Sequence, residues 1–456
     1  MATTVEIRSP YDGAVVGVAA LAEPADVDAA VAAGRSFPTL SVAARTAILD
    51  RAAARLEAEV ETFAALLSAE VAKPIRAARD EVRRAVSTLR FSAVEGRALT
   101  GESIPLAATE AGTGRIGFTI PVPIGVVGGI TPFNFPLNLA AHKVGPAIAA
   151  GCPIVLKPAD QAPLTALALR RLLVEDCELP PQLFHVLPGT AESVGIPLVG
   201  HPDVACISFT GSVPVGWDIR ARAPRKKVLL ELGNNSPVIV MPDVDVAGVA
   251  RTLAGASFGY AGQSCISTQR ILVHRSVIEA FTAALVAAAE ALVVGPPGEE
   301  TTDVSCVIDQ RAADRITTWI DEAAAAGADV LCGAKRDGNT IWPTVIGNVP
   351  ADTAVWREEV FGPVVGLRPF GGLDEAIAAA NDTRFGLQAS IFTNDLDAAW
   401  TAIEELRFGG VLVNEVPPWR VDNMPYGGIA DSGNTKEGPR YAIQEMTDQR
   451  LVVIRR

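Results

Sequence analysis

The 456-residue sequence predicts an α/β protein with two doubly wound α/β domains and a small additional β segment. Three observations support this fold class. Short apolar segments alternate with helical segments along most of the chain, a pattern typical of a parallel sheet covered by helices on both faces. The alternation restarts after Glu231, which indicates a second block. Residues 112–123 and 450–454 are extended, β-rich segments outside the alternation.

The first block is predicted to begin with two helices and to continue as strand–helix units. Residues 43–69 and 73–98 are rich in Ala and carry Leu, Val and Phe at helical spacing. Short apolar runs follow them. We predict strands over residues 124–130, 153–156, 184–187 and 205–209, with helices over 137–150, 164–174 and 191–199 between them.

The second block repeats this alternation. We predict strands over residues 238–241 and 271–274 and helices over 246–258 and 277–293, with further α/β units up to Val413. Two such blocks meeting near residue 232 indicate two lobes with a cleft between them.

The composition argues against several functional classes. The formal net charge is −13, and an acidic surface repels both nucleic acid backbones and anionic membranes. With 49% hydrophobic and 20% charged residues, the chain is not expected to be disordered. The four histidines lie far apart and near no cluster of Cys or acidic residues, so we expect no metal site.

The sequence also indicates a cellular setting. Six cysteines without a C-x-x-C pair argue against a disulfide framework in a chain of this length. Residues 1–13 are polar and lack the apolar core of a secretory signal. The apolar stretch 124–156 is interrupted by Asn, His, Lys and Pro residues, which disfavour a membrane span. We therefore expect a reduced, soluble, cytoplasmic enzyme.

Cys265 is the first candidate for a catalytic residue. A lone cysteine is most often a small core residue, and this interpretation suits the other five. Cys265, however, follows Gly259, Gly262, Gln263 and Ser264, which suit a loop that exposes a side chain in a cleft. From this loop alone, a nucleophile and a core residue remain equally supported.

Glu231 follows an apolar predicted strand and precedes a Gly-Asn turn. A single Glu is most often solvated or ion-paired. At a strand end between hydrophobic segments, however, desolvation can raise its pKa, and the residue could then act as a general base near neutral pH.

Asn134 lies between two aromatic residues and two prolines. Its side chain could cap the helix predicted from residue 137, or could donate an amide N–H to a developing oxyanion. Taken alone, the position favours the cap.

Two loops are candidates for nucleotide contacts. The segment Phe209-Thr210-Gly211-Ser212 runs from a strand into a predicted helix, whose N-terminus could bind a pyrophosphate. Lys157 and Asp160 follow another strand and are placed to meet a ribose. Neither loop matches the G-x-G-x-x-G pattern, and ordinary βα loops explain both equally well.

Taken together and in this order, these segments resemble the aldehyde dehydrogenase superfamily over nearly the whole chain. The resemblance includes further motifs, with the segments around residues 134, 265 and 419–425 nearest the branch of lactaldehyde and non-phosphorylating glyceraldehyde-3-phosphate dehydrogenases. The motifs are Ser9-Pro10-Tyr11-Asp12-Gly13, Lys143-Val144-Gly145-Pro146-Ala147, Gly200-His201-Pro202, Glu358-Glu359-Val360-Phe361-Gly362-Pro363, Asn381-Asp382-Thr383-Arg384-Phe385-Gly386-Leu387, Met424-Pro425-Tyr426-Gly427-Gly428 and Asp431-Ser432-Gly433.

The resemblance implies a fold, a reaction and a set of site residues. It implies an aldehyde dehydrogenase-like fold and NAD(P)-dependent oxidation of an aldehyde to its acid. Cys265 would be the nucleophile, Glu231 the base that activates water, and Asn134 an oxyanion donor together with the Cys265 backbone N–H. The residues implied for cofactor binding are Thr131, Pro132, Phe133, Lys157, Asp160, Gly211, Ser212, Leu232, Gly233, Glu359 and Phe361.

The sequence departs from the family pattern in several places, including Ser305-Cys306 where Gly-Pro is frequent. Phe133 stands where Trp is frequent. Asn234 replaces the second Gly of Glu-Leu-Gly-Gly-Asn, so the loop must hold Asn in a left-handed conformation or take another shape. Asp160 stands where Glu often marks NAD preference. A carboxylate there should repel a 2′-phosphate and favour NAD, although the shorter Asp leaves NADP possible.

The resemblance leaves the substrate open. Glu231 favours release of a free acid, since coenzyme-A-acylating relatives often lack this base. Arg420 could pair with an anionic tail or form a salt bridge to Asp422 or Asp431, and Ser264 replaces an Arg found in several phosphate-handling relatives. An uncharged aliphatic or aromatic aldehyde therefore remains open, as do a coenzyme-A-acylating enzyme and a non-catalytic scaffold. The residues implied for the substrate pocket are Phe135, Ser264, Ile266, Trp419 and Arg420.

The resemblance also divides the chain into functional parts. We expect a dinucleotide-binding domain over residues 1–104 and 124–232 and a catalytic domain over 233–432. Residues 105–123 and 433–456 match segments that pair between subunits, so we expect a homodimer or homotetramer.

Overall fold

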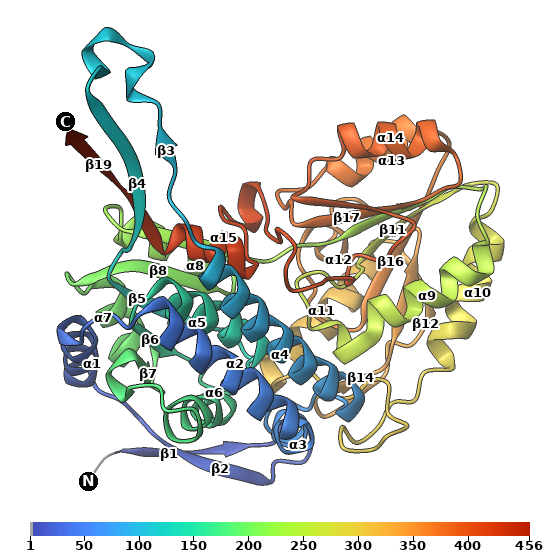
Figure 1. Cartoon of the computed structure of the whole chain (residues 1–456). Helices are drawn as coiled ribbons and strands as arrows, with labels where there is room; N and C mark the ends of the chain where they lie inside the picture. Colours follow the sequence, from blue (N-terminus) through green and yellow to red (C-terminus); the bar gives the residue numbers. More distant parts are fainter. Residues whose placement is uncertain (1–2) are drawn as a thin grey trace.

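The computed structural model describes residues 3–456 and has two α/β lobes and a projecting β arm (Figure 1). The first lobe contains a five-stranded parallel sheet in the order β7-β6-β5-β8-β9. Its strands are β5 (Val126–Ile130), β6 (Ile154–Lys157), β7 (Phe184–Val186), β8 (Val204–Thr210) and β9 (Lys227–Glu231). The strand order changes direction between β5 and β8, and the carboxyl ends of all five strands lie at one edge.

The second lobe contains a seven-stranded sheet in the order β12-β15-β16-β11-β10-β17-β18. All neighbours are parallel except β12 and β15. The strands are β10 (Pro237–Val240), β11 (Arg270–His274), β12 (Asp329–Cys332), β15 (Thr344–Gly347), β16 (Val364–Phe370), β17 (Gln388–Phe392) and β18 (Gly410–Val413). The two sheets confirm the predicted doubly wound α/β fold class.

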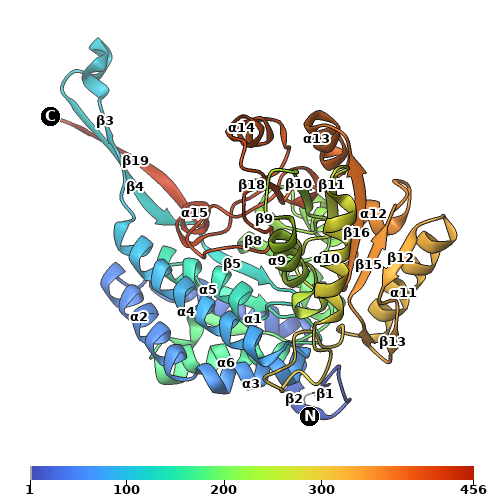
Figure 2. The same ribbon diagram turned by 90° about the vertical axis from the view of Figure 1, so that its right-hand side faces the viewer.

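Helices cover both sheets, and Figure 2 shows the two lobes from the side. Those of the first lobe are α1 (Pro24–Ser36), α2 (Val42–Ala58), α3 (Val60–Val71), α4 (Ile75–Ala98), α5 (Asn138–Ala150), α6 (Pro163–Arg171), α7 (Ile196–Gly200), α8 (Val213–Arg222) and α15 (Pro439–Glu445). Those of the second lobe are α9 (Val246–Phe258), α10 (Ile278–Glu290), α11 (Gln310–Ala325), α12 (Ala354–Arg357), α13 (Leu373–Asn381) and α14 (Leu396–Glu405). Within residues 3–456, no helix is long and apolar enough to cross a membrane.

Most predicted elements are present, with one clear difference. Residues 43–69 were expected to form one helix, but the chain breaks at Glu59 (φ −107°, ψ 21°), between α2 and α3. The break lets α2 and α3 pack against α4 separately. Helix α3 then ends at Ala72, which has the left-handed φ of 51°.

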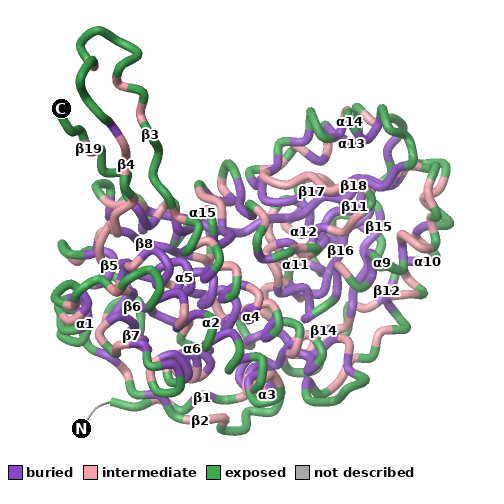
Figure 3. Tube along the Cα trace, viewed as in Figure 1, coloured by how far each residue is buried: buried purple, intermediate pink, exposed green. Residues whose placement is uncertain are grey.

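The β arm is an antiparallel sheet in the order β19-β4-β3, made of β3 (Ser103–Ile104), β4 (Arg115–Pro123) and β19 (Thr447–Arg455). Strands β4 and β19 pair over their full lengths, from Thr447 opposite Pro123 to Arg455 opposite Arg115. The arm projects from the body and is largely exposed (Figure 3). Apolar side chains lie exposed on it, namely Ile116, Ile120, Leu451, Val453 and Ile454.

Two short hairpins complete the described structure: β1 (Thr4–Arg8) with β2 (Val15–Ala20), and β13 (Arg336–Asp337) with β14 (Thr340–Ile341). Separate apolar cores fill the two lobes. One surrounds the seven-stranded sheet, and two others occupy the faces of the five-stranded sheet.

Candidate active site

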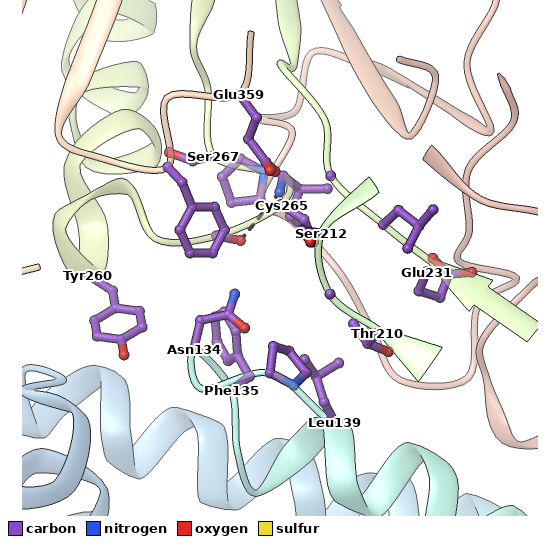
Figure 4. Close-up of a pocket in the computed structure, with 18 of the residues that line it drawn as sticks. Asn134, Phe135, Leu139, Thr210, Ser212, Glu231, Tyr260, Cys265, Ser267 and Glu359 are labelled. Atoms are coloured by element: carbon purple, nitrogen blue, oxygen red, sulfur yellow. Dashed lines mark hydrogen bonds between the residues drawn. The ribbon is translucent and has the colours of Figure 1, made fainter. Parts of the chain in front are cut away.

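A cavity of about 830 Å³ is lined by residues of both lobes. Its walls come from the loop after β5, the ends of β8 and β9, the loop after α9 and the segment after α12 (Figure 4). Parallel sheets bind ligands beyond the carboxyl ends of their strands, so this is the position expected for a cofactor and substrate. Asn134, Glu231 and Cys265 all line it.

A left-handed turn presents Cys265 to the cavity. Tyr260, Ala261 and Gly262 have φ values of 50°, 53° and 68°. A Cβ on Gly262 would collide with the carbonyl of Gly362, so only glycine allows this close approach. The partly buried Cys265 Sγ shares a hydrogen bond of 2.9 Å with the Tyr426 hydroxyl. Burial raises the pKa of the thiol to about 12, while the bond to Tyr426 acts in the opposite direction.

Asn134 does not cap the following helix, contrary to the interpretation favoured from its position alone. Helix α5 starts at Asn138, and the N–H groups of Leu137 and Asn138 donate to the Glu81 carboxylate over 2.9 and 3.1 Å. The buried Asn134 amide instead donates to the Gln263 carbonyl over 2.9 Å, beside the Cys265 loop. Within the described residues, this is the one hydrogen bond that the Asn134 amide nitrogen makes.

Glu231 is 3% exposed at the end of β9. Neither of its carboxylate oxygens has a hydrogen-bond partner within the described residues, so the solvated and ion-paired alternatives do not apply. Burial and the negative charge of Glu437 raise the Glu231 pKa well above its usual value, against the opposing effect of Arg420 and Lys143. The chain approaches closely here, since a Cβ on Gly427 would lie 2.5 Å from Oε1.

A cluster of buried charges lies beside Glu231. Glu437 pairs with Arg420 at 3.1 Å and with Lys143 at 3.7 Å. Asp422 pairs with Arg84 at 2.9 Å and with His142 at 3.0 Å. Burial alone would raise the pKa of Glu437, but the nearby His142, Lys143 and Arg420 lower it to about 2.

Arg420 therefore has a different partner from the two expected. Its guanidinium pairs with Glu437, whereas Asp431 pairs with Arg384. Arg84 and Arg420 both line the cavity, and the buried Nε of each lacks a hydrogen-bond partner in the described part of the chain.

Glu359 is another acidic residue of the cavity wall. Its carboxylate accepts the Asn234 N–H over 2.9 Å, and a Cβ on Gly233 would collide with it. Burial raises the pKa of Glu359 to about 7. Phe361 has a φ of 48° and places its ring edge-on to Phe133, with the centroids 5.9 Å apart.

The Asn234 departure is accommodated without a left-handed residue, since its φ is not positive. Its buried side chain donates to Ser236 over 2.8 Å and to the Gln388 carbonyl over 3.3 Å. The loop therefore takes a shape other than the left-handed one. The Asn234 amide connects Ser236, which directly precedes β10, to Gln388, the first residue of β17.

The cofactor residues expected from the sequence fall into two groups. Pro132, Phe133, Gly211, Ser212, Leu232, Gly233, Glu359 and Phe361 line the cavity. Lys157, Asp160 and Thr131 lie at the same edge of the first sheet but not in the cavity wall. Lys157 is buried and pairs with the more exposed Asp160 over 2.8 Å. Ser212 precedes α8 and forms no side-chain cap, which leaves the helix N–H groups free for an anion.

The expected substrate residues divide similarly. Phe135, Ser264, Ile266 and Arg420 line the cavity, whereas Trp419 does not and is 47% exposed. Sequence reasoning missed Arg84 and Glu437, and it named Tyr426 only within a motif. Tyr426 had a local signal in its Pro-Tyr-Gly-Gly setting. Arg84 had no local signal. It lies on a predicted helix, 181 positions before Cys265, and no motif around it indicates a cavity residue.

Comparisons with known proteins bear on the family of this chain. The "Aldehyde dehydrogenase family" profile matches residues 1–452. The 3-sulfolactaldehyde dehydrogenase of Priestia aryabhattai is 44% identical over 455 residues, covering 99% of this chain and 95% of the relative.

Two solved structures are similarly close. Aldehyde dehydrogenase 21 of Physcomitrella patens, in complex with the reaction product succinate, has a TM-score of 0.95 and 40% identity, covering 100% of this chain and 95% of that chain. The glyceraldehyde-3-phosphate dehydrogenase of Methanocaldococcus jannaschii, complexed with NADP, has a TM-score of 0.95 and 35% identity, covering 100% of both chains. The cavity, its Cys, Glu and Asn, and these matches lead to one conclusion: the chain belongs to the aldehyde dehydrogenase family.

Proposed function

We propose that this protein oxidises a short aldehyde bearing an acidic group to the corresponding carboxylic acid, with NAD as the hydride acceptor and NADP as a possible substitute. The observation that carries this proposal is one cavity that contains Cys265, an unpartnered Glu231, Asn134 and the two arginines with an unpartnered Nε, Arg84 and Arg420.

In this proposal Cys265 is the nucleophile. Its thiol releases its proton to solvent, the sulfur forms a bond to the aldehyde carbon, and the carbonyl π electrons move to oxygen. The second N–H of Asn134 and the Cys265 backbone N–H donate to this oxyanion. No backbone partner of that Cys265 N–H is present in residues 3–456, so it is available. A bound NAD or NADP would supply the hydride acceptor at this stage, and the Cys265 sulfur would then carry the acyl group as a thioester.

Glu231 then acts as the base for hydrolysis. It takes a proton from water, the oxygen attacks the thioester carbon, and the proton later passes from Glu231 to solvent. The carbon–sulfur bond breaks, which frees the acid and restores the thiolate. A carboxylate without a hydrogen-bond partner and with a raised pKa suits such repeated transfers.

Several residues fit the cofactor. The open N-terminus of α8 at Ser212 suits a pyrophosphate, and Glu359 suits a ribose hydroxyl. Lys157 and Asp160 are placed for the second ribose, where the Asp160 carboxylate disfavours a 2′-phosphate.

The acidic group of the substrate is argued from charge. Three basic side chains (Arg84, Lys143 and Arg420) face two carboxylates (Asp422 and Glu437) in the cluster beside the cavity. One carboxylate or sulfonate would meet the unpartnered Nε atoms of Arg84 and Arg420. The relatives named above for sulfolactaldehyde, succinate and glyceraldehyde 3-phosphate all involve anionic compounds.

The remaining assignments rest on the sequence and the family. We propose that residues 1–104 and 124–232 bind the dinucleotide and that 233–432 form the catalytic domain. We also propose that the arm, with its exposed apolar side chains, joins subunits into a homodimer or homotetramer. The six cysteines are unpaired, which supports a reducing cytoplasm.

The test is a turnover assay with 4-oxobutanoate and its uncharged methyl ester, using NAD and NADP separately and no coenzyme A. We expect a kcat/KM about 10- to 100-fold higher for the acid, since a hydrogen bond to a charge contributes about 1.5–3 kcal/mol. Arg84→Gln should reduce that preference. Equal rates would refute the acidic substrate, and turnover only with coenzyme A would refute hydrolysis.

A further inference from the structure

Tyr426 lies against the sulfur of Cys265, with its hydroxyl oxygen 2.9 Å from Sγ. We propose that Tyr426 is a further catalytic residue, whose hydroxyl donates a hydrogen bond to the Cys265 thiolate and holds the sulfur until the carbon–sulfur bond forms. This inference rests on the proposed role of Cys265 as the nucleophile.

The phenol can only act as the donor to a thiolate. Burial raises the Tyr426 pKa well above its usual value, and the Cys265 charge raises it further, so the phenol keeps its proton throughout the working pH range. A thiolate has no proton to offer. A hydrogen bond to an ion is stronger than one between neutral groups, so the pair favours the deprotonated sulfur. After attack the sulfur is uncharged, and the bond weakens without any proton transfer by Tyr426.

The backbone holds Tyr426 in place. Its N–H donates to the Glu437 carbonyl over 3.1 Å, and the Glu437 N–H donates back over 2.5 Å. The ring packs with Ile266 and Leu387 in a small apolar cluster that includes Cys265. The Arg420 guanidinium covers the ring face, 3.7 Å from the centroid. Because the ring is enclosed on these sides, the hydroxyl has little freedom to leave the sulfur.

The surroundings of Cys265 disfavour its thiolate, and a hydrogen-bond donor offsets this effect. Glu359 and Glu231 face the sulfur and both raise its pKa, while Arg420 lowers it. Burial acts in the same direction as the two carboxylates. Among residues 3–456, Tyr426 is the one side chain that hydrogen-bonds to Sγ. It therefore partly offsets an environment that otherwise disfavours the reactive thiolate.

Tyr260 is a matched control. It is the other tyrosine of the cavity wall, it is also buried, and its hydroxyl donates to the Val71 carbonyl over 3.2 Å. In Figure 4 its hydroxyl points away from Cys265. Tyr260→Phe thus removes one buried hydroxyl from the same cavity without touching the sulfur.

The experiment compares the purified wild type, Tyr426→Phe and Tyr260→Phe. Thiolate formation is followed by ultraviolet absorbance against pH, with a Cys265→Ser titration subtracted, and by the rate of iodoacetamide alkylation. In Tyr426→Phe we expect the titration to move up by roughly one pH unit and alkylation at matched pH to slow by about tenfold. In Tyr260→Phe both should follow the wild type.

A Tyr426→Phe titration that coincides with the wild type would overturn the inference. If that variant does not fold, 3-fluorotyrosine at position 426 provides the opposite test: its more acidic phenol should lower the thiol titration, and no change would overturn the inference. The proposed function fails separately, if the wild type oxidises no aldehyde or if Cys265→Ser retains turnover.

Discussion

Two of the carboxylates that line the cavity, Glu359 and Glu231, have different settings. Glu359 accepts a backbone N–H from Asn234, and its pKa is raised to about 7. Glu231 has no hydrogen-bond partner in the described chain, and its pKa is raised well above its usual value. A carboxylate that positions a ligand benefits from a fixed orientation. One that takes and releases protons is more reactive when no donor stabilises its charge. The comparison assigns binding to Glu359 and proton transfer to Glu231.

Glu231→Gln tests the proton-transfer role of Glu231 and has the largest expected effect. Because an amide cannot accept the proton of water, we expect steady-state turnover to fall by roughly 10²- to 10⁴-fold. The first equivalent of reduced cofactor should still appear as a burst in rapid-mixing absorbance. Loss of the burst itself would mean that Glu231 is needed before hydrolysis.

The matching change at the second carboxylate is Glu359→Gln. The amide oxygen can still accept the Asn234 N–H, so the loop should keep its shape. We expect KM for NAD to rise by roughly tenfold, since one charged hydrogen bond to the cofactor is weakened. Steady-state kinetics at saturating aldehyde measure this. A fall in kcat with unchanged KM would contradict a binding role.

The remaining prediction concerns stability rather than turnover. The folded-state pKa of Glu359 is about 7, above the unfolded value, so the folded protein binds the proton more tightly. Stability from this group is therefore complete below about pH 4 and is lost as the pH rises through 7. Allowing for partial exposure, the loss amounts to about 1–3 kcal/mol.

Urea unfolding of the wild type and Glu359→Gln at pH 5 and pH 8 measures this difference. The wild type should lose stability relative to the variant as the pH rises. If both proteins changed stability equally between pH 5 and pH 8, the pKa of Glu359 in the folded protein would not lie in this range.

The sequence predicted what depends on local pattern. Strands β5, β6, β8, β10 and β11 lie within two residues of their expected positions, because short apolar runs between turns mark buried parallel strands. Cys265, Glu231 and Asn134 were found through motifs, and the structure brings all three to one cavity.

What escaped prediction depends on distant partners. Glu81, 56 residues before Leu137, caps α5. No local pattern in the sequence shows this contact, so the nearby Asn134 was the more plausible cap. The break at Glu59 has no local breaker residue and follows from the packing of α2 and α3 on α4. The contact between Tyr426 and Cys265 joins positions 161 apart.

The Glu437 pairings have a consequence for synthesis. The five-stranded sheet is complete once residue 231 has been made, but buried Lys143 lacks its carboxylate until residue 437 leaves the ribosome. Strand β4 likewise waits for β19. The first lobe therefore spends the translation of some two hundred residues with an uncompensated internal charge and an open edge, the period in which a nascent chain depends most on chaperones.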